Sequence, residues 1–571
     1  MNTAEYLIKN LEELGISDFF GLPGDYNFNL IYSIQENPNT EWIGCTNELN
    51  AGYAADGYAR EKGYGAIVTT YGVGELSAMN AIAGSYAENI PVINIVGAPS
   101  TKVLEEKQVV HHQFSNPEPY AFLEAYKNIT QTTAFLTRDN AKIEIDRVLK
   151  AFVKERKPVY ICIPEDIAVM EISDKEANYN WISDRKTLKA VAEKISEKIK
   201  KSECPIILAD VLTKRFNAVR DLVLFADKSG IPVTNFVMGT GIFDFDYKNY
   251  LGTYLAEYGN PYAKKYLETT DCLIAVGAIY SDFNSLGFKL PYKIDSQVAI
   301  YGTYTYVDGV KYENVKMSDV LRELTELVET REYDFVKSEL GYEKSGDGES
   351  LNSEFIYSKI QEYLKEGDII YAEAGLIPYG MFGVKLPERT EFNLQGLWCS
   401  IGWATSAAFG ACVAKPDSRI VLITGEGAHQ ISALEVGNMV RLGLKPTIIV
   451  INNKGYTIER IISGRPENEF NNIVNINYSK LARIFEGDVW STRVETAEDF
   501  DKALRVTGIM KKLCYIEVCV DETDVPALAE AFYGRTISET QKPKRRIKKE
   551  EKISKKSDNK YSTVTHESLQ I

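Results

Sequence analysis

The stretch RIVLITGEGAHQISALEVGNMVRLGLKPTIIVINNKGYTIE, residues 419–459, decides the fold. It opens with an apolar run that ends in a Gly-flanked acid, continues through a segment of helical character, and returns to a second apolar run, TIIVINN. A strand, a helix and a strand in this order form a parallel βαβ unit, because parallel strands need a crossover between them. We therefore predict an α/β fold of mainly parallel sheets flanked by helices.

Polar residues follow both of these predicted strands. Glu426 stands between Gly425 and Gly427 at the end of the first strand, and Asn453 follows the second. The glycines allow a ligand to approach the backbone, and the amide groups of a helix that we expect to begin near Ala428 favour a phosphate. Both strands end at the same sheet edge, so Glu426 and Asn453 offer oxygen ligands that suit Mg²⁺ beside that phosphate.

The same alternation of strand-like and helical segments extends along most of the 571 residues, a length that suggests three or four domains. We place an N-terminal domain at 1–175, a central domain at 186–340 and a C-terminal domain at 351–540. The segments DKEANYNWISDRK and GYEKSGDGES are the predicted linkers. Residues 541–571 have almost nothing to bury, and we predict a basic disordered tail. No internal repeat is visible.

The composition excludes several classes of protein. An apolar share of 44% and a charged share of 25% are those of a globular protein, and no apolar run approaches the roughly 20 residues of a membrane span. The N-terminus reads as a first helix and not as a signal peptide. A net charge of −15 argues against nucleic-acid binding by the body of the protein, although the basic tail leaves such contact open. Eight scattered cysteines favour reduced thiols and a cytoplasmic location.

Two of the four histidines are adjacent, in VVHHQF at residues 109–114. Imidazole is the side chain whose ordinary pKa lies nearest neutral pH. The pair either belongs to an unremarkable loop or serves a site that transfers protons, and the residues around it must decide between these interpretations.

Six blocks of sequence resemble thiamine diphosphate-dependent 2-oxo acid decarboxylases, in the branch of pyruvate and indolepyruvate decarboxylases. The blocks, in this order, are GLPGDYN, CTNELNAGYAADGYAR, SYAENIPV, VVHH, SIGWATSAAFG and NNKGYTIE, and the resemblance covers nearly all of the chain except the tail. It implies the three-domain thiamine diphosphate-binding fold, with thiamine diphosphate and Mg²⁺ as cofactors. It also implies non-oxidative decarboxylation of a 2-oxo acid to an aldehyde and CO₂, in a homodimer or homotetramer whose active sites lie between subunits.

The resemblance assigns roles to particular residues. Glu48, which alone reads as a first-turn acid, is implied to hydrogen-bond the aminopyrimidine ring of a cofactor held mainly by the other subunit. The small residues after it are expected to pack against that second subunit. Ile401 matches the residue that holds the cofactor bent. The implied proton-transfer groups are Asp25, His111, His112 and Glu459. The further implied cofactor contacts are Ala374, Gly425, Gly427, Ala428, Asn453 and Tyr456. The implied metal ligands are Glu426, Asn453 and Gly455.

Four positions depart from the family pattern. Glu426 replaces the usual aspartate, and Gln113 and Ala374 stand where threonine is usual. Pro378 replaces a bulky aromatic residue of the substrate pocket. We expect Pro378 to line an apolar pocket together with Phe283, Tyr379, Ile458 and Ile462. Such a pocket suits a neutral or hydrophobic 2-oxo acid and disfavours its charged carboxylate relative to the neutral product of CO₂ loss.

Two alternatives stay open. One is a carboligase similar to acetolactate synthase, although the histidine pair and the YTIE segment argue against it, because ligation requires an enamine that escapes protonation. The other is a catalytically degenerate homologue that acts as a binding protein, which the departures at Glu426, Gln113 and Ala374 keep possible. The sequence does not distinguish pyruvate, indolepyruvate, phenylpyruvate and branched-chain acids as substrates.

Overall fold

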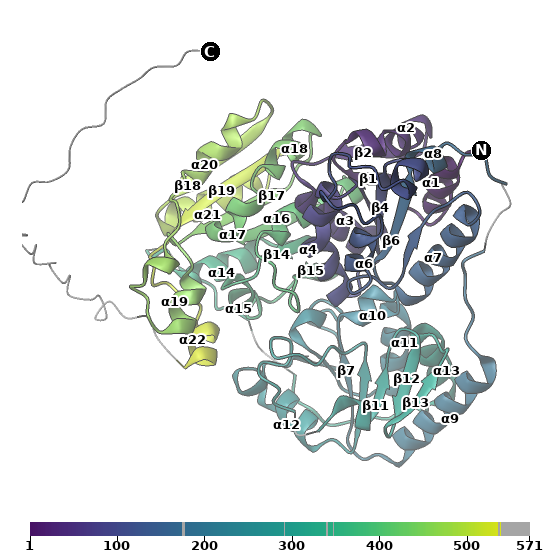
Figure 1. Cartoon of the computed structure of the whole chain (residues 1–571). Helices are drawn as coiled ribbons and strands as arrows, with labels where there is room; N and C mark the ends of the chain where they lie inside the picture. The colour runs from purple at the N-terminus through teal and green to yellow at the C-terminus, as the bar shows by residue number, and fades with distance from the viewer. Residues whose placement is uncertain (174–177, 291, 338–340, 347, 535–536, 538–571) are drawn as a thin grey trace, which may run out of the picture.

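The computed structural model describes residues 1–571 except 174–177, 291, 338–340, 347, 535–536 and 538–571, so the predicted tail at 541–571 lies outside the described residues. Three sheets follow one another along the chain, and helices cover each of them (Figure 1). The predicted α/β class is confirmed. Among the described helices, none has the length and apolar character needed to cross a bilayer.

The N-terminal sheet has six parallel strands in the order β2-β1-β3-β4-β6-β5. Their bounds are β1 (Asp18–Gly21), β2 (Glu41–Gly44), β3 (Gly65–Thr70), β4 (Val92–Ala98), β5 (Thr133–Phe135) and β6 (Val159–Pro164). The helices of this domain are α1 (Thr3–Glu13), α2 (Phe28–Glu36), α3 (Glu48–Lys62), α4 (Val73–Ala87), α5 (Thr101–Glu105), α6 (Ala121–Tyr126), α7 (Ala141–Glu155) and α8 (Glu165–Ala168). The first helix starts at a capping box, in which Asn2 and Glu5 each accept a backbone N–H of the other.

The C-terminal sheet repeats this strand order. Its sequence is β15-β14-β16-β17-β19-β18, which corresponds strand for strand to the N-terminal sheet, and all of its pairs are parallel. The strands are β14 (Ile369–Ala372), β15 (Glu391–Asn393), β16 (Ile420–Gly425), β17 (Thr447–Asn452), β18 (Val489–Val494) and β19 (Leu513–Cys519). The helices are α14 (Ser353–Tyr363), α15 (Ile377–Met381), α16 (Trp403–Ala414), α17 (Glu426–Ser432), α18 (Glu435–Arg441), α19 (Thr457–Ser463), α20 (Tyr478–Leu481), α21 (Ala497–Thr507) and α22 (Ala527–Tyr533). The chain therefore contains a structural duplication that the sequence did not reveal.

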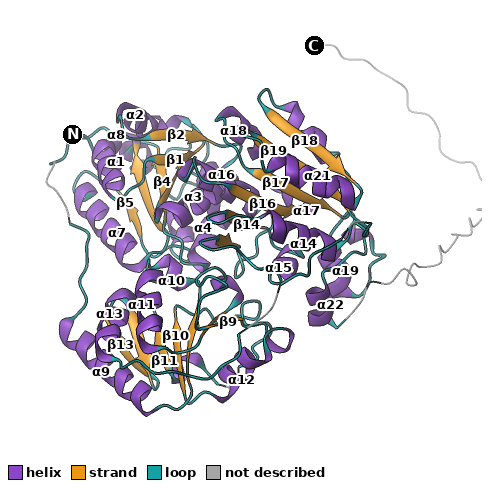
Figure 2. Ribbon diagram, turned by 180° about the vertical axis from the view of Figure 1, so that it is seen from behind, coloured by secondary structure: helices purple, strands orange, loops and turns teal. Residues whose placement is uncertain are grey.

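The central domain carries a mixed sheet in the order β13-β12-β11-β10-β7-β8-β9, in which only the hairpin edge is antiparallel. Its strands are β7 (Pro205–Ala209), β8 (Val233–Asn235), β9 (Tyr250–Thr253), β10 (Cys272–Val276), β11 (Val298–Ile300), β12 (Tyr304–Val307) and β13 (Val310–Glu313). Its helices are α9 (Arg185–Lys201), α10 (Leu212–Arg215), α11 (Val219–Ser229), α12 (Pro261–Thr269) and α13 (Met317–Leu327). Figure 2 shows this domain below the other two, with α10 reaching up toward their junction.

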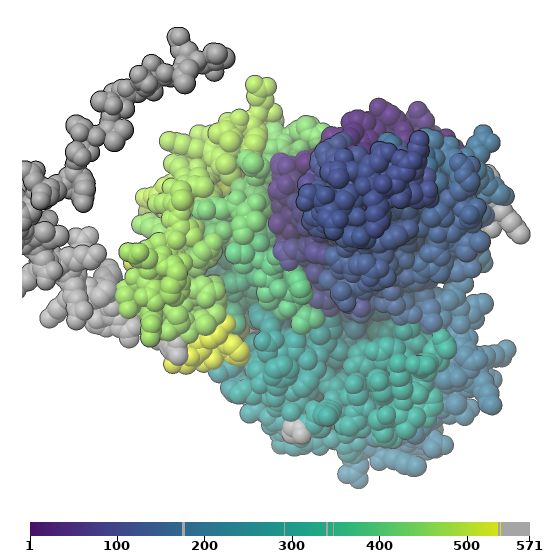
Figure 3. Space-filling model, viewed as in Figure 1, coloured from purple at the N-terminus to yellow at the C-terminus, as the bar shows by residue number. Residues whose placement is uncertain are grey.

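The N-terminal and C-terminal domains share one apolar core, and they lie side by side in the space-filling view (Figure 3). At its centre α3 packs on α16, and each helix contributes the pattern A-x-x-G. A Cβ on Gly57 would overlap the backbone of Ala407, and a Cβ on Gly410 would overlap that of Ala54. Each glycine thus meets the alanine that lies three residues before the other glycine, so the two helices approach closely and reciprocally.

This packing corrects one expectation. The small residues of α3 were predicted to face a second subunit, but they are buried within the single chain, against α16 and α4. The reason is that α16 carries matching small residues, which let the two backbones of one chain approach each other.

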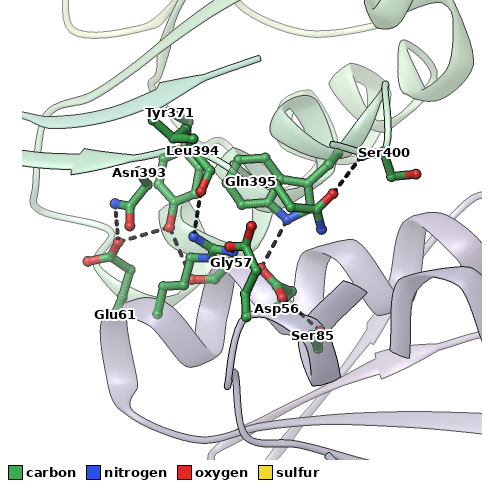
Figure 4. Close-up of polar contacts among 12 residues, drawn as sticks. Asp56, Gly57, Glu61, Ser85, Tyr371, Asn393, Leu394, Gln395 and Ser400 are labelled. Carbon is green, nitrogen blue, oxygen red and sulfur yellow. Dashed lines mark hydrogen bonds and ion pairs between the residues drawn. The ribbon is translucent and has the colours of Figure 1, made fainter. Parts of the chain in front are cut away.

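A buried polar network accompanies this helix contact (Figure 4). The Arg60 guanidinium donates to Asp56 at 2.8 Å, to Glu88 at 2.8 Å and to the carbonyl of Leu394 at 3.0 Å. The indole of Trp403 also donates to Asp56, at 3.0 Å. Every charge in this network has a hydrogen-bonded counter-charge, as burial requires, so the network fixes how the two domains sit relative to each other.

Candidate active site

A cleft of about 670 Å³, open to solvent, lies at the carboxyl edge of the C-terminal sheet. Ten residues predicted from the sequence line it: Ala374, Ile401, Gly425, Glu426, Gly427, Ala428, Asn453, Gly455, Tyr456 and Ile458. They come from the ends of β14, β16 and β17 and from the loop before α16, because parallel strands deliver their following loops to one edge.

Oxygen atoms converge at one end of this cleft. Glu426 Oε1 accepts the N–H of Gly455 at 2.7 Å. The inner amide atom of Asn453 lies 3.2 Å from Glu426 Oε1 and 2.7 Å from the carbonyl oxygen of Gly455. Asn453 with its nitrogen turned inward donates to both oxygens, and this is the orientation that satisfies its hydrogen bonds. Burial raises the pKa of Glu426 to about 7, because removal from water disfavours the charged form of a carboxylate.

Hydrogen bonds from Arg460 hold the turn of residues 453–455, which follows β17. Arg460 is buried, and its guanidinium donates to the carbonyls of Asn453 and Lys454 at 3.3 and 3.1 Å. Gly455 has φ +147°, and a Cβ there would overlap the carbonyl of Asn471. The glycine is therefore required by the backbone, and Arg460 positions the turn. The sequence analysis missed Arg460.

Glu373 joins two loops of the cleft. Its carboxylate accepts the N–H of Ala374 at 3.0 Å and that of Ala404 at 3.1 Å, and the side chain is fully buried. Burial raises its pKa to about 7. One loop carries Ala374, and the other carries Ile401, so this carboxylate links two walls of the same cleft. The sequence contained the signal, an acid directly after a buried strand, but we had considered only its neighbour Ala374.

The predicted proton-transfer groups of the N-terminal domain also meet. His111 Nε2 lies 2.8 Å from Asp25 Oδ2, and the rings of His111 and His112 are 4.5 Å apart. Tyr26 stacks on His111 at 4.8 Å, with its hydroxyl 3.3 Å from His111 Nδ1. Asp25 follows β1, and the histidines follow β4, so strands of one sheet edge bring them together.

Glu48 begins α3 at the same edge of the N-terminal sheet. Its Oε1 lies 3.2 Å from the point that a Cβ of Gly74 would occupy, and this places it at the start of α4. The preceding turn is tied to the C-terminal domain, because Thr46 donates its N–H to Glu435 at 2.9 Å. Glu435 is buried, and the sequence analysis had not considered it.

The predicted site residues form two groups within one chain. Among the described residues, those lining the cleft come from the C-terminal part of the chain, and Asp25, Glu48, His111 and His112 are not among them. Four further predicted residues, Phe283, Pro378, Tyr379 and Ile462, do not line it either. Pro378 is buried in α15, and Phe283 stacks edge-on with Tyr379, whose hydroxyl meets that of Tyr533 at 2.8 Å. Glu459 and Ile462 are exposed on α19.

Comparison with known families matches this chain to three successive models: the N-terminal, central and C-terminal domains of thiamine pyrophosphate enzymes, at residues 1–118, 192–304 and 379–518. Pyruvate decarboxylase of Kluyveromyces lactis is 34% identical over 91% of this chain and 96% of its own length. The chain belongs to the thiamine diphosphate-dependent 2-oxo acid decarboxylases. Pyruvate decarboxylase isozyme 2 of Saccharomyces cerevisiae is 33% identical over the same shares, and the alpha-keto-acid decarboxylase of Mycobacterium avium is 34% identical over 92% and 94%.

Membership in this decarboxylase family confirms the resemblance found in the sequence. The matched C-terminal binding domain contains most of the cleft, and the matched N-terminal domain contains Asp25, Glu48 and the histidine pair. The resemblance found in the sequence predicts that the two groups of residues serve one reaction. Their separation within the chain therefore needs an explanation.

Proposed function

We propose that this 2-oxo acid decarboxylase binds thiamine diphosphate together with Mg²⁺ in the C-terminal cleft, and that a second copy of the chain completes the active site. The observation that carries the proposal is that Glu426, Asn453 and Gly455 lie within hydrogen-bond distance of one another at one end of the cleft. When bound, thiamine diphosphate supplies the electron sink for decarboxylation of the 2-oxo acid to an aldehyde and CO₂.

The spacing of the oxygens supports a magnesium site. Octahedral ligands about 2.1 Å from Mg²⁺ lie about 3.0 Å apart. The inner amide atom of Asn453 lies 3.2 Å from Glu426 Oε1 and 2.7 Å from the Gly455 carbonyl, so turning the amide to place its oxygen there would give separations that bracket this value. The extra methylene of Glu426 thus leaves its carboxylate within reach of a shared cation. A Cβ added to the neighbouring Gly425 would meet no atom within 4 Å. The space beside this glycine is therefore open to a diphosphate.

An exposed apolar surface supports the second copy. Val73 and Leu76 of α4, Trp398 and Ile401 before α16, and Leu434 before α18 are each between 39% and 56% exposed. Trp398 donates its indole N–H to Asn80 of α4 at 2.9 Å, which joins α4 to the loop that borders the cleft. Apolar side chains that stay this exposed in a single chain are expected where a second subunit covers them. We propose a homodimer, or a dimer of dimers, in which Glu48 and the histidines of one copy face the cleft of the other.

In that arrangement some residues of the chain would transfer protons, and others would form the apolar walls of the cleft. Asp25 and His111 share a hydrogen bond between Oδ2 and Nε2, so a proton can be held at either atom and delivered to the reacting carbon. His112 and Glu459 are the further proton-transfer groups. Ile377, Ile401 and Ile458 give the cleft apolar walls that exclude water and suit a neutral or hydrophobic side chain on the 2-oxo acid.

A mixing experiment tests the shared site. Glu48→Gln and Glu426→Gln should each abolish aldehyde release from pyruvate. If the site is shared, a hybrid dimer has one doubly damaged site and one intact site. Random mixing makes half of the dimers hybrid, so about one quarter of wild-type activity should return. If each chain holds a complete site, no activity returns, and the proposal is wrong. Calorimetry of thiamine diphosphate binding with and without Mg²⁺ tests the metal separately.

Product analysis separates the remaining alternatives. A carboligase would convert pyruvate to acetoin or acetolactate, whereas a decarboxylase releases acetaldehyde. A degenerate binding protein would release neither product. We also propose a cytoplasmic location, which is supported by eight cysteines that are all free thiols.

A further inference from the structure

We propose that Asp25, His111 and His112 form a binding site for Zn²⁺ or a similar transition-metal ion, and that occupancy of this site inhibits the enzyme reversibly. One oxygen and two nitrogens, one from each side chain, lie within 4.8 Å of one another. Two imidazoles and one carboxylate form a three-ligand set that is common around zinc, with a further position left for water.

The three ligands are already held close to a chelating arrangement. His111 Nε2 and Asp25 Oδ2 are 2.8 Å apart, so a small movement would allow both atoms to reach one ion. Tyr26 supports the set from the other side: its ring stacks on His111 and meets His112 edge-on at 6.1 Å. Its hydroxyl, 3.3 Å from His111 Nδ1, leaves Nε2 facing Asp25. A partner on the second ring nitrogen is the usual support of a metal-binding histidine.

His112 is fixed by its backbone. It has φ +64°, in the left-handed region, and its carbonyl occupies the place where a Cβ of Gly72 would stand. The Nδ1 atom of its ring is buried and has no hydrogen-bond partner. The folded protein therefore holds this loop in one conformation before an ion binds. This lowers the conformational entropy cost of binding the ion.

The chemistry of the ligands separates this site from the magnesium site. Imidazole nitrogen binds Zn²⁺, Cu²⁺ and Ni²⁺ well, whereas Mg²⁺ prefers oxygen. The side chains of His111 and Asp25 are 55% and 49% exposed in the single chain, so an ion that enters the cleft between the two proposed copies would meet them directly. An ion bound here would occupy the lone pairs that accept protons during the reaction. The loss of activity rests on the proposed function of these groups, but binding of the ion does not.

Equilibrium dialysis of the holoenzyme against Zn²⁺, with thiamine diphosphate and Mg²⁺ in excess, tests the site. The test variant is His111→Ala combined with His112→Asn, because asparagine tolerates the left-handed backbone of position 112. Cys399→Ser removes an exposed thiol, and Glu426→Gln alters the magnesium site, so both serve as matched controls for zinc bound elsewhere. Tyr26→Phe removes the supporting hydroxyl. Circular dichroism checks that each variant is folded.

We expect one tightly bound Zn²⁺ per chain in the wild type and in both controls, and none in the histidine variant. Tyr26→Phe should weaken binding about 10-fold. Aldehyde release should fall in proportion to occupancy and return when a chelator removes the zinc. Equal zinc binding by the histidine variant and the wild type would overturn the site. Binding that leaves activity unchanged would overturn the inhibition while leaving the site intact. Full inhibition without stoichiometric binding would also overturn the proposal.

Discussion

Replacing Glu373 tests whether one buried carboxylate sets the shape of the cofactor cleft. The Glu373→Ala variant removes the acceptor of the buried N–H of Ala404 and of the part-buried N–H of Ala374. An unsatisfied buried N–H costs about 1–3 kcal/mol and a part-buried one less, so the free energy of unfolding should fall by about 1–5 kcal/mol. Glu373→Gln keeps one carbonyl oxygen and should lose about half as much. Glu388→Ala, at an exposed position of the same domain, should change stability by less than about 0.5 kcal/mol.

Urea denaturation measures the stability, and calorimetry measures thiamine diphosphate affinity in the folded variants. A positioning role requires that both change, because the loops bridged by Glu373 carry Ala374 and Ile401. If Glu373→Ala unfolds like the wild type, the hydrogen bonds described here do not stabilise the fold. If stability falls while cofactor affinity and KM stay unchanged, Glu373 supports the fold but does not shape the cleft.

Three further predictions follow from buried contacts. Gly410→Ala should lower the free energy of unfolding in urea by about 1–3 kcal/mol or more, because a Cβ there overlaps the backbone of Ala54. Gly508→Ala is its control, because a Cβ at that position meets only ordinary van der Waals contacts. Burial raises the pKa of Glu75 to about 7 from its ordinary 4.5, so the native state holds a proton that the unfolded chain releases. Stability should therefore fall by about 3 kcal/mol as pH rises from 4.5 to 7, and a Glu75→Gln variant should show a flatter pH profile of melting temperature. Glu426→Gln should weaken Mg²⁺-dependent cofactor binding in calorimetry by at least about 10-fold, and equal affinity would exclude Glu426 as a metal ligand.

The sequence predicted the parts of the site that depend on local pattern. Apolar runs that end in a polar residue located β16 and β17, and these placed Glu426 and Asn453 at one edge. The helix after β16 starts at Glu426, two residues before the expected Ala428, because the acid itself occupies the first turn. The linker boundaries and the roles of the site residues remain predictions that mutagenesis must test.

The interactions that the sequence analysis missed are those between segments far apart in the chain. Arg460 and Glu373 act through backbone atoms of neighbouring loops, and a side-chain pattern does not record such contacts. Phe283 and Tyr379 pack with aromatic neighbours, and their place in the substrate pocket stays a prediction. Aromatic residues near a site are attracted to one another as readily as to a substrate, so their type alone does not give their direction.

The duplicated strand order gives the division of the site a physical basis. Glu48 follows β2 at the start of α3, and Ile401 follows β15 just before α16, so the two residues occupy corresponding places in the two domains. The paired A-x-x-G segments of α3 and α16 bring these two helices together inside one chain. This pairing binds the domains through their helices and leaves the N-terminal proton-transfer groups outside the cleft of the same chain. For the proposed second copy, a two-fold arrangement is the simplest geometry that would bring each set of N-terminal groups to a cleft, because one repeated contact would serve both sites.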